Sequence, residues 1–141
     1  MSEPRAVVAG HGEYASGIIS AVQQITGRGD MLIAVSGAGR SAAEIEALIR
    51  STLAERDVRV IFTDLHAGSC SMAARRLMRG IEDAVLVCGA NLPTLLDFVM
   101  ADGLTPQDAA TRALERGRGA MMMVGPSAPP APAGPTGGGT A

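Results

Sequence analysis

The stretch "AVVAGHGEYASGIISAVQQITGRGDMLIAV", residues 6–35, decides the fold. It begins with a short apolar run that ends at Gly10-His11-Gly12, and it closes with a second apolar run over residues 31–35. Between the runs, residues 14–26 have the period of an amphipathic helix, which Gly27 ends. One helical face carries the apolar side chains Ile18, Ile19, Val22 and Ile25. A strand, a helix and a strand in this order predict a right-handed βαβ unit with parallel strands.

The same alternation continues along the chain. Apolar runs predict strands over residues 5–10, 31–35, 58–63 and 84–88, and a short fifth strand at 119–124. Helices are expected at 14–26, from the capping box Ser41-Ala-Ala-Glu44 through Leu53, at 69–79, at about 92–101, and from Thr105-Pro106 to about Arg116. The strands are apolar on both faces, as in a sheet that helices cover. We therefore expect an α/β fold with a doubly wound, mostly parallel sheet of order 2-1-3-4, a possible antiparallel fifth strand, and helices on both faces.

The length of 141 residues suits one domain. We expect that domain over residues 1–124. Residues 125–141 contain Gly, Pro, Ala, Ser and Thr without periodicity, which predicts a disordered tail.

Composition excludes several classes of partner. The net charge is −2, and no basic stripe is interleaved with aromatic residues, so nucleic acid and anionic lipid are not expected partners. No apolar run approaches the roughly 18 residues that a membrane span needs, and the N-terminus lacks the pattern of a signal peptide. We expect a soluble, cytoplasmic protein.

The two cysteines, Cys70 and Cys88, lack CxxC spacing and are expected to be reduced thiols. Cys88 is expected in the core, whereas Cys70 lies near a helix start, where a thiol can become reactive.

The expected strand order brings two side chains to one crevice. Ligands of open parallel sheets bind beyond the carboxyl ends of the strands, where the strand order reverses, and here this point lies between the first and third strands. His11 follows the first strand and Asp64 follows the third. A carboxylate bonded to one imidazole nitrogen leaves the other nitrogen as a nucleophile. Gly68-Ser69 begins a helix, whose N-terminal amides favour an anion.

A nucleophilic imidazole, an orienting carboxylate and an anion site together describe a phosphoryl acceptor. Taken singly, each has a structural interpretation: a histidine at a tight turn, an aspartate that caps a turn, and an ordinary helix start. A phosphoryl acceptor requires that the three features meet at one place.

Three stretches carry a resemblance to a known family: VAGHGEYASG (8–17), FTDLHAGS (62–69) and VCGANLPTLL (87–96). Over residues 5–124, the sequence resembles the mannose-family IIA component of the bacterial sugar phosphotransferase system. This resemblance implies that His11 takes a phosphoryl group from the carrier HPr and passes it to a IIB component. It further implies that Asp64 orients His11 and that Gly68 and Ser69 bind the phosphate.

The resemblance also implies partners. The family is often dimeric through an exchanged C-terminal strand, which matches residues 120–124 here. No IIB domain lies within the 141 residues, so a separate IIB protein is expected, with only indirect membrane association through the permease. No metal, nucleotide or other cofactor is expected, because the phosphoryl donor is already activated.

The chain departs from the family pattern in the loop after the third strand. Ala67 and Cys70 stand where the family usually has Gly and Pro, so the phosphoacceptor is expected to be intact, whereas the family's partner choice and exchange rate do not carry over to this chain. His66 stands where a large apolar residue is usual. It is interpreted as a loop residue over the crevice, with an accessory acid–base or weak metal-ligand role as the alternative.

Three other functions stay open at the level of sequence. A regulatory phosphohistidine module and the phosphotransfer subunit of a dihydroxyacetone kinase would have a similar fold. Gly10-x-Gly12-x-x-Ala15 also fits a loose dinucleotide fingerprint, but Asp30 lies at the start of the second strand, which is the wrong end to hold a ribose.

Overall fold

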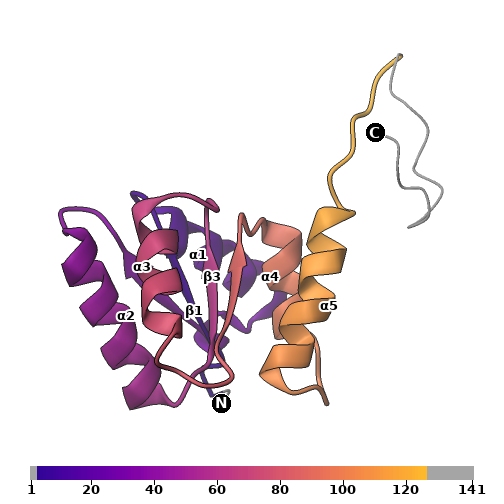
Figure 1. The fold of residues 1–141 in the computed structure, drawn as a ribbon. Helices are drawn as coiled ribbons and strands as arrows, with labels where there is room; N and C mark the ends of the chain where they lie inside the picture. Colours follow the sequence, from indigo (N-terminus) through magenta and orange to yellow (C-terminus); the bar gives the residue numbers. More distant parts are fainter. Residues whose placement is uncertain (1–2, 127–141) are drawn as a thin grey trace.

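Strands and helices alternate along residues 3–126, the part of the chain that the computed structural model describes (Figure 1). The elements are β1 (Ala6–Gly10), α1 (Tyr14–Thr26), β2 (Leu32–Ser36), α2 (Ala42–Arg56), β3 (Val60–Thr63), α3 (Ser69–Met78), β4 (Val85–Cys88), α4 (Leu92–Val99) and α5 (Pro106–Arg118). A single 3-10 turn, Gly29–Met31, precedes β2.

The four strands form one parallel sheet of order β2-β1-β3-β4. Val8 of β1 lies between Ala34 of β2 and Phe62 of β3 in the register. The predicted α/β class and strand order are therefore confirmed. The order reverses between β1 and β3, so the loops after these two strands lie side by side at the carboxyl edge of the sheet.

Each face of the sheet has its own core. Alternate strand residues point to opposite faces, and helices α1, α4 and α5 cover the face that contains Val8 and Phe62. Helices α2 and α3 cover the other face, which contains Val7 and Ile61 (Figure 1). Because both faces are buried, the strands are apolar throughout, as the sequence suggested. Phe62 and Phe98 both belong to the core on the α1, α4 and α5 side, where their rings meet edge to face with centroids 5.0 Å apart.

The helix starts follow the caps that the sequence contains. The Ser41 hydroxyl accepts from the Glu44 amide while the Glu44 carboxylate accepts from the Ser41 amide, so the capping box is formed. At the start of α5, the Thr105 hydroxyl accepts from the Asp108 amide. Helix α1 ends at Gly27, whose φ of 75° is the left-handed conformation of a helix end. No helix within residues 3–126 is long and apolar enough to cross a membrane.

Two expectations differ from the structure. Ile25, expected on the core face of its helix, is 60% exposed, because the helical turn directs it away from the face on which Ala15 and Val22 are buried. Residues 119–124 form no strand within the described chain; they run away from the body beyond α5, with Met121 and Val124 each 83% exposed (Figure 1). The tail expected at residues 125–141 falls almost wholly outside the described residues.

Candidate functional site

The structure brings His11 and Asp64 together at the carboxyl edge of the sheet. His11 directly follows β1, and Asp64 directly follows β3. The His11 Nδ1 atom lies 2.8 Å from Asp64 Oδ2, and the backbone amide of His11 donates to the same oxygen at 2.8 Å. One carboxylate oxygen therefore fixes both the backbone and the ring of His11.

This arrangement determines which imidazole nitrogen is free. Burial alone would raise the pKa of the Asp64 carboxyl, but the hydrogen bonds from the His11 amide and ring, together with the imidazole charge, lower it below its ordinary value. The carboxylate is thus ionised near neutral pH and can only accept hydrogen bonds. The proton of a neutral His11 ring must then be on Nδ1, which leaves a lone pair on Nε2. The His11 side chain is 56% exposed, whereas that of Asp64 is 13% exposed, so the ring is accessible and its partner is sheltered.

Two glycines make room for this pair. A Cβ atom at Gly68 would lie 2.7 Å from Cε1 of His11, so the imidazole packs directly on the Gly68 backbone. A Cβ atom at Gly10 would lie 2.9 Å from the Asp64 carboxyl and would also collide with the Tyr14 ring. The glycines on both sides of the site are therefore needed for close approach of the side chains.

The start of α3 lies against the same imidazole. Gly68 is the N-cap residue and Ser69 is the first residue of this ten-residue helix. The first amides of a helix lack intrahelical acceptors and favour an anion. Gly68 and Ser69, both selected from the sequence, thus form the start of α3, and the Gly68 backbone lies beside the exposed ring of His11.

Two other candidate side chains lie near this site but differ in their surroundings. His66 is exposed on the loop between β3 and α3, and its carbonyl accepts from Arg75 Nη2 at 3.0 Å. Cys70 is 1% exposed, and both burial and the Asp64 charge raise the pKa of its thiol. Cys70 is consequently a buried protonated thiol, so the reactive role considered for it from sequence has no support. Cys88 is half-buried at the end of β4 and is a free thiol, as Cys70 is.

Sequence reasoning missed one residue that adjoins the pair. The Tyr14 hydroxyl donates to the Ala90 carbonyl at 2.7 Å and so ties the start of α1 to the loop after β4. Burial, and secondarily the Asp64 charge, raises the pKa of Tyr14 to about 12. Its position three residues after His11, at the first turn of a helix, was the available signal.

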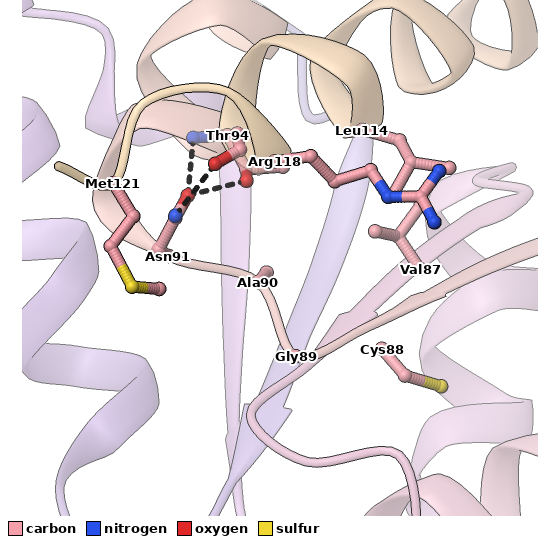
Figure 2. Close-up of a pocket in the computed structure, with 10 residues that line it drawn as sticks. Val87, Cys88, Gly89, Ala90, Asn91, Thr94, Leu114, Arg118 and Met121 are labelled. Carbon is pink, nitrogen blue, oxygen red and sulfur yellow. Dashed lines mark hydrogen bonds between the residues drawn. The ribbon is translucent and has the colours of Figure 1, made fainter. Parts of the chain in front are cut away.

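A cavity of about 460 Å³ lies farther along the same edge, where β4 meets α4 and α5. Figure 2 shows Cys88, Arg118 and Met121 around it, with Asn91 and Thr94 hydrogen-bonded to each other on one wall. Val87 and Cys88 of β4 line this cavity, as does Met121, which lies beyond α5. Across residues 3–126, no three His, Cys, Asp or Glu side chains gather in a group that could hold a metal ion.

Comparison with known families supplies the decisive observation. A family model described as the PTS system fructose IIA component matches residues 5–114. The chain belongs to this family. It is a mannose-family IIA component of a sugar phosphotransferase system, the family that its sequence resembles, and this membership implies a phosphotransfer role. A comparison of this chain with curated proteins found no match.

Solved structures share the fold of this IIA component. The mannose/sorbose-specific IIA subunit from Enterococcus faecalis is 18% identical, with a TM-score of 0.76 over 88% of this chain and 96% of that chain. Component EIIA from Streptococcus agalactiae is also 18% identical, with a TM-score of 0.72 over 81% of this chain and 92% of that chain. The IIA protein associated with the fucose utilization operon of Streptococcus pneumoniae is 21% identical, with a TM-score of 0.67 over 82% and 93%. At such identities the likeness concerns the fold.

Proposed function

We propose that this IIA component accepts a phosphoryl group on Nε2 of His11 from phosphorylated HPr and passes it to a IIB component during sugar uptake. The observation that carries the proposal is the 2.8 Å contact between His11 Nδ1 and Asp64 Oδ2. It leaves Nε2 as the free, exposed nucleophile. The exchange takes place in the cytoplasm and reaches the membrane only through the permease.

The transfer step needs little beyond positioning. The lone pair of His11 Nε2 forms the new N–P bond, while the N–P bond of the donor phosphohistidine breaks and its electron pair returns to the donor ring. Asp64 stabilises the positive charge that develops on the His11 ring. The Gly68 and Ser69 amides and the Ser69 hydroxyl stabilise the phosphoryl oxygens. Because the donor is already activated, the step consumes neither a metal ion nor a nucleotide.

The chain contains two histidines, which gives the test a matched control. The full chain is incubated with phosphoenolpyruvate, enzyme I and HPr, and the intact mass is measured. We expect one acid-labile phosphoryl group on the natural chain and on His66→Ala, and none on His11→Ala. Labelling of His11→Ala, or its loss in His66→Ala, would contradict the assignment.

The IIA component acts as a homodimer in this proposal. Within residues 3–126, β4 is the last strand of the sheet and pairs on one side only. Residues 119–124 follow α5, Met121 lines the cavity beside β4, and the apolar side chains of Met121, Met122, Met123 and Val124 are exposed. We infer that residues 120–124 of one subunit lie as an antiparallel strand along β4 of the other, next to the cavity of Figure 2.

Light scattering on the full chain and on a chain that ends at Gly119 tests the exchange. We expect a dimer for the former and a monomer for the latter, at equal micromolar concentration. A dimer that survives the truncation would show that another surface joins the subunits, and a full-length monomer would remove the dimer altogether.

A further inference from the structure

Helix α3 holds the loop that carries Asp64 at two points. Ser71 and Arg75 are one helical turn apart, so their side chains leave the same face of α3. Ser71 contacts Thr63 and the Leu65 carbonyl, and Arg75 contacts the His66 carbonyl. These contacts lie immediately before and after Asp64 in the sequence.

The contact at Ser71 is a closed cluster of two hydroxyls and one carbonyl. Ser71 and Thr63 are both fully buried, with their hydroxyl oxygens 2.6 Å apart. The Thr63 hydroxyl also lies 3.1 Å from the Leu65 carbonyl, and the Ser71 hydroxyl contacts that carbonyl too. Each hydroxyl has one proton, so one bond joins the two hydroxyls and the other bond ends on the carbonyl. The backbone on both sides of Asp64 is thereby fixed to α3.

The contact at Arg75 extends this hold by one residue. Arg75 is exposed, and its Nη2 atom donates to the His66 carbonyl at 3.0 Å. A bond from a guanidinium is charge-assisted and is stronger than a neutral one. It holds the loop at the point where the chain turns toward Gly68, whose backbone packs on the His11 ring.

We propose that Ser71 and Arg75 are positioning residues that set the Asp64 carboxylate, and through it the tautomer and orientation of His11. The proposal rests on the proposed function for its effect on phosphoryl transfer. Neither side chain touches the reacting atoms. Their bonds remove backbone freedom from residues 63–66, which would otherwise let Oδ2 drift from Nδ1 and allow the Nε2–H tautomer, in which the nucleophilic lone pair is lost.

Arg75 permits a clean test because it is exposed. Arg75→Met removes the bond to the His66 carbonyl, Arg75→Lys restores a cationic donor, and Arg79→Met at the far end of α3 is the control. ¹⁵N NMR of the His11 ring reports which nitrogen carries the proton. We expect a mixed tautomer signal in Arg75→Met, recovery in Arg75→Lys, and the natural signal in Arg79→Met.

The rate of transfer from phosphorylated HPr is the second readout. We expect Arg75→Met and Ser71→Ala each to lower it about threefold to tenfold, the effect of one lost hydrogen bond, with an unchanged melting temperature in Arg75→Met. A natural tautomer signal and rate in Arg75→Met would overturn the proposal, whether or not Ser71→Ala folds. If the natural chain takes no phosphoryl group, the proposed function fails, and the NMR readout still tests the positioning role.

Discussion

Asp64 Oδ2 accepts two hydrogen bonds from a residue 53 positions away in the chain. The second oxygen, Oδ1, is buried and, among residues 3–126, has no hydrogen-bond partner. Oδ2 thus bonds His11 through both its amide and its ring. These two bonds fix the orientation of His11, as expected of an orienting group, and the Asp64 charge also raises the pKa of Tyr14 and of Cys70.

Gly68→Ala should abolish most transfer without unfolding the protein. The new methyl group would lie 2.7 Å from His11 Cε1, so the ring must move. A displacement of about 1 Å at a reacting atom costs about a hundredfold in rate. Transfer kinetics and thermal melting measure the two effects separately.

Gly17→Ala serves as the control for this substitution. Gly17 lies in α1 with open space around its Cα, so alanine there should stabilise the helix by roughly 0.5–1 kcal/mol and leave transfer intact. Full transfer by Gly68→Ala would show that the close packing on the ring is unimportant.

Tyr14 should titrate near 12 instead of 10. Burial and the Asp64 charge both disfavour the phenolate. The chain has one tyrosine and no tryptophan, so absorbance at the phenolate band reports this residue alone. The raised pKa means that stability falls as the pH rises above 10, the value in the unfolded chain. Asp64→Asn should lower the Tyr14 pKa; an unchanged or higher value would contradict the inferred coupling.

At the scale of elements, the sequence located all four strands and five helices, because apolar period and caps are local signals. Thr63 and Ser71 illustrate what it did not reveal. Their hydroxyls form a buried contact across eight residues, and nothing in the local pattern distinguishes them from solvent-facing hydroxyls. Some ends of the elements also differ from the prediction. β3 begins at Val60, two residues later than expected, because its pairing with β4 begins at that residue.

The fifth strand expected at residues 119–124 is not formed within the described chain, for a related reason. Their composition suits a strand, but a strand needs a neighbour, and within the described chain this segment leaves the sheet instead of joining it. Local sequence specifies the tendency to pair and cannot specify the chain that provides the partner.

We expect the packing of α4 against α5 to lose stability when one methyl group is added at Gly117. A Cβ atom at Gly117 would collide with Thr94 Oγ1 and lie 3.0 Å from Asn91 Oδ1, the atom that caps α4. Gly117→Ala should lower the free energy of unfolding by about 1–3 kcal/mol, the usual cost of overpacking. Urea denaturation measures it.

Gly119→Ala is the paired control, two residues farther along. Its new methyl group would lie 3.7 Å from the Glu115 carbonyl, an ordinary contact, so stability should change little. Equal stability of the two variants would mean that the helices can separate at no cost.

For the whole molecule, the pairing of His11 with Asp64 links stability to pH. The folded-state pKa of Asp64 lies below its ordinary value of 3.8, so the ionised form is favoured by folding. This contribution is complete above pH 3.8 and is lost as the pH falls through the lower folded value.

Thermal melts between pH 2 and pH 7 on the natural chain and on Asp64→Asn measure this contribution. We expect a shallower loss of stability at acid pH in the variant, which also transfers phosphoryl groups more slowly but remains folded at neutral pH. Identical acid slopes would contradict the assigned pKa shift.

The candidate site was foreseen from the sequence to the extent that it follows from topology. Once the strand order is 2-1-3-4, the ends of β1 and β3 are neighbours, and His11, Asp64, Gly68 and Ser69 must gather there. The Tyr14 and Ser71 contacts depend on side-chain packing over the finished sheet, which no single stretch of sequence encodes.

The two helix layers have a consequence for how the molecule matures. His11 leads into α1, which packs on one face of the sheet, whereas Asp64 and Gly68 lead into α3, which packs on the opposite face. The contact between His11 and Asp64 therefore forms only after β1 and β3 have paired side by side. Under the proposed function, a polypeptide in which β3 has not yet paired with β1 leaves the imidazole unoriented and takes no part in transfer.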